Sequence, residues 1–197
     1  MRSGITALAV IASIAVAGPA AAQFSDTYNF FKAVRDKDVQ KAREILDRPG
    51  ATVINAREAA TGDAPLHIVV RQRDLGWVGF LLQANADVNV RDRDGNTPLI
   101  LAATGRFTEG VRILIAVRAA VDQRNNAGET ALVKAVQAND VDDAKLLLDA
   151  GANPDLTDSS AGYSARQYAA RGGRQAMIKL LADAKPRIAA PMQGPPR

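Results

Sequence analysis

The chain has 197 residues and a net charge of +4, with 25 Lys and Arg against 21 Asp and Glu. This length is enough for one domain with a substantial core. The absence of Cys excludes a disulfide framework, a thiolate zinc site and a Cys nucleophile, and the single His argues against a His-rich metal centre. The charge is mild and the basic residues are dispersed, so we expect no nucleic-acid partner.

Residues 1–22 have the pattern of a secretory signal peptide. Arg2 gives a positive start, residues 5–17 form an apolar run, and residues 20–22 are three alanines that favour cleavage after Ala22. A membrane anchor is the alternative interpretation, but the run is shorter than the roughly 20 residues that span a bilayer. We therefore expect an exported chain that has no membrane span after cleavage.

The segment that follows predicts two short helices. Apolar residues recur at helical spacing between Asp26 and Leu46, and the polar stretch Asp36–Asp38 interrupts them. A helix pair with a polar outer face is what the end of a repeat array requires. We interpret residues 23–57 as an N-terminal capping repeat.

A period of 33 residues then governs the chain. Gly62, Gly95 and Gly128 follow one another at this spacing, and Gly162 begins a fourth copy. The segments read Gly62-Asp-Ala-Pro-Leu-His67, Gly95-Asn-Thr-Pro-Leu-Ile100, Gly128-Glu-Thr-Ala-Leu-Val133 and Gly162-Tyr-Ser-Ala-Arg-Gln167. Such a fixed period predicts an all-α solenoid of stacked helix-turn-helix units, and not a globular enzyme core.

The period also divides the chain into units. Full repeats are expected over 58–91, 92–124 and 125–157, a C-terminal capping repeat over 158–185, and a disordered Pro-rich tail over 186–197. Leu81, Leu114 and Leu147 share one position of the period and should form a continuous core ladder. Arg166 stands where the earlier copies have Leu66, Leu99 and Leu132, and we interpret it as a charge tolerated on the outer side of the last unit.

Start and stop signals place the helices within each unit. Thr97, Thr130 and Ser164 are expected to cap the first helices, whereas Ala64 cannot accept a hydrogen bond there. The second helices should end in a left-handed turn at Asn85, Arg118 and Gly151, which is sterically costly for Arg118.

These residues resemble the ankyrin repeat. Asp92-Arg-Asp-Gly-Asn-Thr-Pro-Leu99, with Ala102-Ala103, is similar to the family signature, as are Asn85-Ala-Asp-Val-Asn89 and Gly151-Ala-Asn-Pro-Asp155. The chain departs from the pattern at Arg73, Arg106 and Asn139, where the family usually has Gly. The resemblance implies turns that project as fingers, and a concave face of fingers and first helices that binds other proteins.

The residues that could suggest chemistry have simpler interpretations. The resemblance implies that His67 makes structural hydrogen bonds between finger and helix. Trp77 falls in the apolar register and is expected in the core. The acidic pairs Asp36/Asp38 and Asp142/Asp143 stand at turns or helix starts, where acids favour the helix dipole. No phosphate loop, nucleophile elbow or metal spacing is present, so we expect no cofactor, no metal site and no catalytic residue.

The register assigns a set of candidate partner contacts on the concave face. Arg and Tyr are preferred anchors at protein interfaces, and the alternative is an ordinary solvated surface. The set comprises Arg71, Arg93, Asp94, Asn96, Arg124, Asn126, Glu129 and Tyr163.

The sequence therefore predicts a non-enzymatic protein–protein interaction module in the bacterial periplasm, monomeric and binding its partner on the concave face. The resemblance extends to periplasmic ankyrin proteins associated with catalase and protection from peroxide, which implies a role in stress protection. One alternative is a secreted effector that binds a host or competitor protein, which would need a second export step. The others are an enzyme with a cryptic site around His67 and a structural role through self-association.

Overall fold

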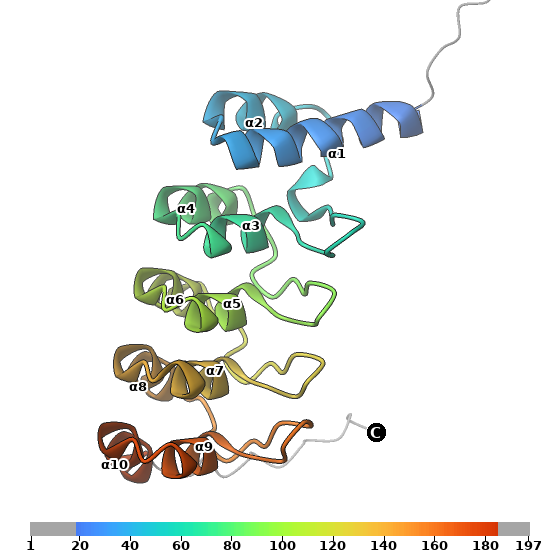
Figure 1. Ribbon diagram of the computed structural model, residues 1–197. Helices are drawn as coiled ribbons and strands as arrows, with labels where there is room; N and C mark the ends of the chain where they lie inside the picture. The colour runs from blue at the N-terminus through green and yellow to red at the C-terminus, as the bar shows by residue number, and fades with distance from the viewer. Residues whose placement is uncertain (1–18, 185–197) are drawn as a thin grey trace, which may run out of the picture.

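The computed structural model describes residues 19–184. Within this range the chain forms ten α-helices, one short 3-10 helix and no strand (Figure 1). In chain order they are α1 Pro19–Asp36, α2 Val39–Leu46, η1 Val53–Asn55, α3 Pro65–Arg71, α4 Leu75–Gln83, α5 Pro98–Thr104, α6 Thr108–Ala116, α7 Ala131–Ala138, α8 Val141–Asp149, α9 Ala165–Arg171 and α10 Gln175–Asp183. An all-helical solenoid is therefore confirmed for the described residues.

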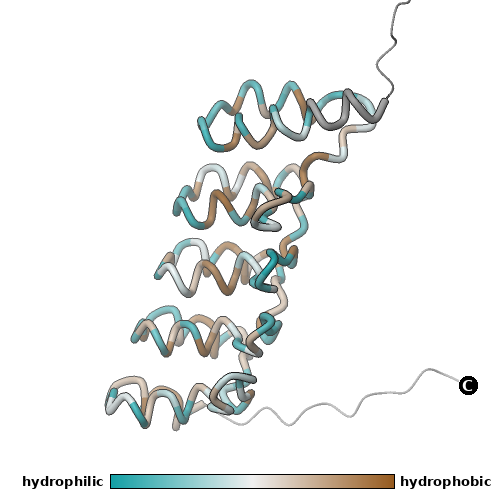
Figure 2. Tube along the Cα trace, turned by 45° about the vertical axis from the view of Figure 1, so that its right-hand side comes forward, coloured by the Kyte–Doolittle hydropathy of each residue, from teal (hydrophilic) through white to brown (hydrophobic). Residues whose placement is uncertain are grey.

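Antiparallel helix pairs stack into a single column, and the turns between successive pairs project from one side of it (Figure 1). The hydropathy colouring shows apolar stretches along the helices and polar stretches at many of the projecting turns (Figure 2). Each pair is too small to bury its apolar face alone, so its neighbours in the stack must cover it.

One hydrophobic core runs through the stack. Leu81, Leu114 and Leu147 are all 0% exposed, which confirms the ladder expected from the period. Trp77 is buried as well and packs edge-on against Phe80, with the ring centroids 5.2 Å apart. The second helices thus line the core at a register that the sequence specifies.

The first helices begin as their N-cap residues predict. The hydroxyls of Thr97 and Thr130 each accept a hydrogen bond from a main-chain N–H three residues on, at 3.3 Å. Ser164 does the same for Gln167, at 3.4 Å. Ala64 offers no acceptor, so α3 lacks this bond.

Left-handed backbone occurs at the predicted helix ends. The φ angles are 62° at Asn85, 64° at Arg118 and 90° at Gly151. Arg73 and Arg106 also adopt positive φ, of 53° and 51°, at positions where the resemblance leads one to expect Gly. The turn geometry is therefore kept although the residue type has changed.

The arginines at these turns link neighbouring repeats. The guanidinium of Arg73 donates to the carbonyl of Gly105, and that of Arg106 donates to the carbonyl of Ala138. Each carbonyl stands at the C-terminus of the next unit's first helix, where main-chain acceptors lack partners within the helix. Each of these turns is therefore bonded to the first helix of the next unit.

A second ladder joins the loops that end each unit. Side-chain oxygens of Asn55, Asn89 and Asp122 accept hydrogen bonds at 2.8 Å from the N–H groups of Asp87, Ala120 and Asn153, respectively. Adjacent units are therefore held together at the helix ends and at the loops, as well as through the core.

Arg166 corrects one expectation from the sequence. Its Nε lies 2.8 Å from Asp155 Oδ1, and its Nη atoms donate to the carbonyls of Leu181 and Ala184. This side chain therefore holds the end of α10 and is not merely a charge tolerated on the outside.

The expected signal peptide and the expected Pro-rich tail lie at the two ends of the chain. Most of the expected signal peptide and the tail over 186–197 fall outside the described residues. Helix α1 begins at Pro19, so cleavage after Ala22 would remove its first four residues. Among the described helices, none is both long enough and apolar enough to cross a membrane.

A polar groove on the concave face

Three finger turns are shaped by a buried polar side chain that accepts main-chain hydrogen bonds, namely Asp92, Asn125 and Asp158. In the second full repeat, Asp92 Oδ1 accepts a hydrogen bond from the Asn96 N–H at 2.7 Å. Gly95 at the tip has a φ of 79°, and a Cβ there would collide with the Asn126 side chain. The sequence Asp-x-x-Gly-Asn therefore closes this turn in a way that requires glycine at its tip.

Successive fingers are tied together along the main chain. The N–H of Arg93 donates to the carbonyl of Thr61 at 3.0 Å, and the N–H of Asn126 donates to that of Asp94 at 2.9 Å. The N–H of Ser159 continues the series to the carbonyl of Ala127 at 2.8 Å. The fingers therefore form a fixed row and not a set of independent loops.

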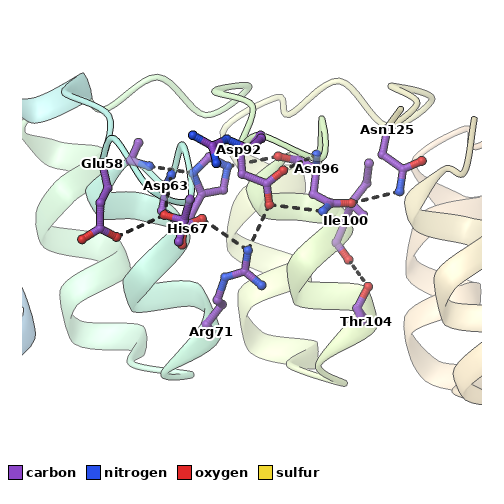
Figure 3. A network of polar contacts seen from close by, with 12 residues as sticks. Glu58, Asp63, His67, Arg71, Asp92, Asn96, Ile100, Thr104 and Asn125 are labelled. Atoms are coloured by element: carbon purple, nitrogen blue, oxygen red, sulfur yellow. Dashed lines mark hydrogen bonds and ion pairs between the residues drawn. The ribbon is translucent and has the colours of Figure 1, made fainter. Parts of the chain in front are cut away.

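His67 lies at the base of this row and is 0% exposed. Its Nδ1 accepts from the Ala64 N–H at 2.9 Å, and its Nε2 lies 3.1 Å from the carbonyls of both Val90 and Asn96 (Figure 3). This geometry places the ring proton on Nε2. Burial lowers the pKa of His67, against the opposing charges of the nearby acids. The ring is a neutral structural link, as the resemblance implies, and is not available as a catalytic base.

Arg71 bridges two repeats beside His67. Its Nη2 lies 2.9 Å from Asp92 Oδ2 and 3.3 Å from Asp63 Oδ1 (Figure 3). The Asp92 side chain is only 2% exposed. Replacing Arg71 with Glu would set a carboxylate against two others and weaken the fold, so that change is unsuitable for testing partner binding.

The network continues into the third full repeat. Asn125 Nδ2 donates to Asn96 Oδ1 at 2.9 Å and to Glu129 Oε2 at 3.0 Å. Glu129 also pairs with Lys134, at 2.6 Å. Burial acts to raise the pKa of Glu129, but the hydrogen bonds from Lys134 and Asn125 outweigh it and the pKa is lowered.

These side chains border a groove of about 440 Å³ on the concave face. It lies where the fingers meet α5 and α7, and it is open to solvent. The lining residues are Arg71, Asp94, Asn96, Leu101, Thr104, Asn125, Asn126, Ala127, Glu129 and Lys134. An open, polar groove spanning several repeats suits a protein segment better than an enclosed small molecule.

The groove brings together five of the eight candidate contacts, namely Arg71, Asp94, Asn96, Asn126 and Glu129. The set left out the other five lining residues, Leu101, Thr104, Asn125, Ala127 and Lys134. Leu101 and Lys134 are one period apart and stand three residues before Thr104 and Gln137 on the same helix faces. The repeat register carried enough information to find them.

The other three candidates contact other parts of the protein. Arg93 Nη2 donates to the carbonyl of Ala59 at 2.6 Å, and Arg124 Nε donates to that of Gly128 at 2.9 Å. The Tyr163 ring lies under the Arg171 guanidinium, 4.7 Å from its centroid. None of the three lines the groove.

Asp142 and Asp143 both lie in the first turn of α8, at the helix start that the sequence indicated. Asp142 is exposed, but Asp143 is fully buried, and neither of its carboxylate oxygens has a hydrogen-bond partner among the described residues. Burial raises its pKa to about 6. Within residues 19–184, no cluster of three or more His, Cys, Asp or Glu is placed to hold a metal ion.

Comparison with known proteins agrees with this architecture. The family model described as "Ankyrin repeats (3 copies)" matches residues 30–125, 66–158 and 119–191. The chain is also 35% identical over 82 residues to the human "2-5A-dependent ribonuclease" and 36% identical over 77 residues to that of Mus musculus. The matches cover 42% and 39% of this chain, but only 11% and 10% of those proteins. The matched family model spans most of the sequence, and the chain belongs to the ankyrin repeat family.

Proposed function

We propose that this protein is a non-enzymatic binding module that holds a partner protein in the concave groove. Ankyrin repeats indicate protein–protein interaction. The observation that supports this site is the convergence of polar side chains from three repeats on one groove, held in place by bonds between the repeats. Groups fixed before binding lose little entropy when a partner arrives.

The site supports binding better than catalysis. His67, the single histidine of the sequence, is buried and hydrogen-bonded to main-chain groups through both ring nitrogens. The similarity to ribonucleases covers about a tenth of those proteins and gives no reason to assign their activity to this chain.

We further propose that the module works in the bacterial periplasm, in a role connected with stress protection. The support for export is the signal-like pattern of residues 1–22, and the connection with stress rests on the family resemblance. Fractionation of the native cells, with the protein detected in the periplasm and not in the culture medium, is the expected result. Accumulation in the medium without lysis would favour a secreted effector.

Affinity capture from a native periplasmic extract tests the groove. Thr104 is exposed, and its hydroxyl bonds only to its own helix, at the Ile100 carbonyl 2.8 Å away, so Thr104→Trp should fill the groove without unfolding the protein. Arg112→Trp, at an exposed position on α6, is the matched control. We expect a protein that is retained by the wild type and by Arg112→Trp but lost with Thr104→Trp. Equal retention of the partner by both variants would show that the partner binds outside the groove.

A further inference from the structure

The finger turns are defined as residues 57–63, 91–96 and 124–129. Their carboxylates differ in exposure: Asp94 is exposed, whereas Glu58 and Glu129 are half-buried and paired with Arg35 and Lys134. The carboxylates of Asp63 and Asp92 point inward and are buried. Four arginines of the same turns lie toward the outside: Arg57, Arg93 and Arg124 are exposed, and Arg91 is half-buried.

No carboxylate pairs with any of these four arginines in the described part of the chain. The arginines that do form ion pairs there are Arg35, Arg48, Arg71 and Arg166. All 21 acidic residues of the sequence fall within residues 19–184, so the undescribed ends hold no Asp or Glu that could pair with the finger arginines. Among the described residues, the finger arginines are therefore cations that form no ion pair within the protein.

Neutral acceptors hold three of these guanidinium groups in place. Arg93 is bonded to the Ala59 carbonyl, and Arg124 to the Gly128 and Thr157 carbonyls. Arg91 Nη2 lies 3.4 Å from Asn126 Oδ1. These contacts use one or two of the five N–H donors of each guanidinium. The other donors are free to bind an oxyanion.

We propose that the finger arginines form a docking surface for an acidic segment of the partner protein. This inference rests on the proposed binding function and adds the chemistry of the partner. The carboxylates of Asp and Glu match the forked donors of arginine, and because three of the four arginines are oriented beforehand, less entropy is lost on binding.

Asp94 provides a control of opposite sign on the same surface. It is exposed, no cation pairs with it among the described residues, and it stands next to Arg93 at a finger tip. Its charge should repel an acidic segment. Removing the charge should therefore strengthen the binding that loss of the arginines weakens.

The test measures binding of fluorescent octaglutamate and octalysine peptides to the mature chain. Octaglutamate should bind, and more weakly as salt rises from about 50 mM to about 300 mM. The double variant Arg57→Gln/Arg91→Gln should weaken this binding about fivefold, while Asp94→Asn should strengthen it about twofold. Arg112→Gln/Lys179→Gln removes the same charge from exposed positions on second helices and should change binding little.

Two results would overturn the inference. One is octalysine binding at least as tightly as octaglutamate, and the other is equal weakening by the two double variants. Thermal unfolding of each variant checks that it is folded. If a captured partner is sensitive to Thr104→Trp but not to Arg57→Gln/Arg91→Gln, the groove proposal stands and this one fails.

Discussion

Asp143 lies in the first turn of α8, at the position that Trp77 and Met177 occupy in other units. Burial is the main cause of its raised pKa. The Thr108 hydroxyl acts to lower the pKa but forms no hydrogen bond of normal geometry with the carboxylate. The charges of Asp140, Asp142 and Glu109 add to the effect of burial. A carboxylate in this setting costs stability when it is ionised.

The Asp143→Asn variant should reveal this cost as a function of pH. The folded protein keeps a proton on Asp143 between the ordinary aspartate pKa of 3.8 and about 6, whereas the unfolded chain releases it. The free energy of unfolding therefore falls as pH rises through this window, by at most about 3 kcal/mol. Urea unfolding from about pH 4 to pH 7 should show that the wild type loses this stability relative to Asp143→Asn.

The exposed neighbour supplies the control for this measurement. Asp142→Asn removes a charge from the same helix turn and keeps the buried carboxylate. Because the Asp142 charge only adds to the larger effect of burial on the pKa of Asp143, this variant should keep most of the wild-type pH slope. The lowered pKa of His67 acts in the opposite direction, because protonation near the ordinary histidine value of 6.5 disfavours the fold, but it is common to all three proteins and cancels in the difference. A constant difference between wild type and Asp143→Asn across the range would contradict the prediction.

At the scale of the helix, α3 differs from its counterparts in lacking a side-chain N-cap. Ala64 has φ and ψ of −87° and 163°, nearly identical to the −88° and 163° of the capping residue Thr97. The hydroxyl of a Thr at residue 64 would therefore reach the His67 N–H as Thr97 reaches the N–H of Ile100. We expect Ala64→Thr to raise the free energy of unfolding by about 1 kcal/mol in chemical denaturation.

The converse change gives a matched reference for this prediction. Thr97→Ala removes an existing cap and should lower the free energy of unfolding by about 1 kcal/mol. A loss of stability in Ala64→Thr would mean that the buried site at the start of α3 has no room for the larger side chain.

At the scale of the whole molecule, stability depends on stacking between neighbours. Leu114 is in the middle of the core ladder and contributes to one cluster that extends through the repeats. Leu114→Ala should lower the free energy of unfolding by about 2–5 kcal/mol, because the cavity cannot be filled from either side. Leu181→Ala, in the last unit, should cost less because terminal units have only one neighbour.

Denaturation followed by circular dichroism checks both variants against the wild type. A loss below about 1 kcal/mol for Leu114→Ala would contradict a close-packed continuous core. A greater loss at Leu181 than at Leu114 would contradict the nearest-neighbour description of the stack.

The sequence by itself determined the repeat, the helix pairs, the caps and the core ladder. It could do so because stacking similar units places residues of one register in one column, as Leu81, Leu114 and Leu147 show. The same register identified the concave face. It also identified five of the residues that line the groove. The sequence alone was sufficient to place a residue wherever its packing partner lay within the same unit or at the same position of the next unit.

Only the tertiary structure decided what the polar side chains contact. Arg71 looked like a free anchor, but it is bound to Asp92 from the next repeat. Arg166 holds carbonyls at the end of α10, and Asp143 is buried, which its position at a helix start did not reveal. The period fixes which backbone positions lie near one another, but a long side chain can reach residues at other positions of its own repeat or of a neighbouring repeat. Their hydrogen bonds and burial depend on neighbours whose residue type changes from one repeat to the next.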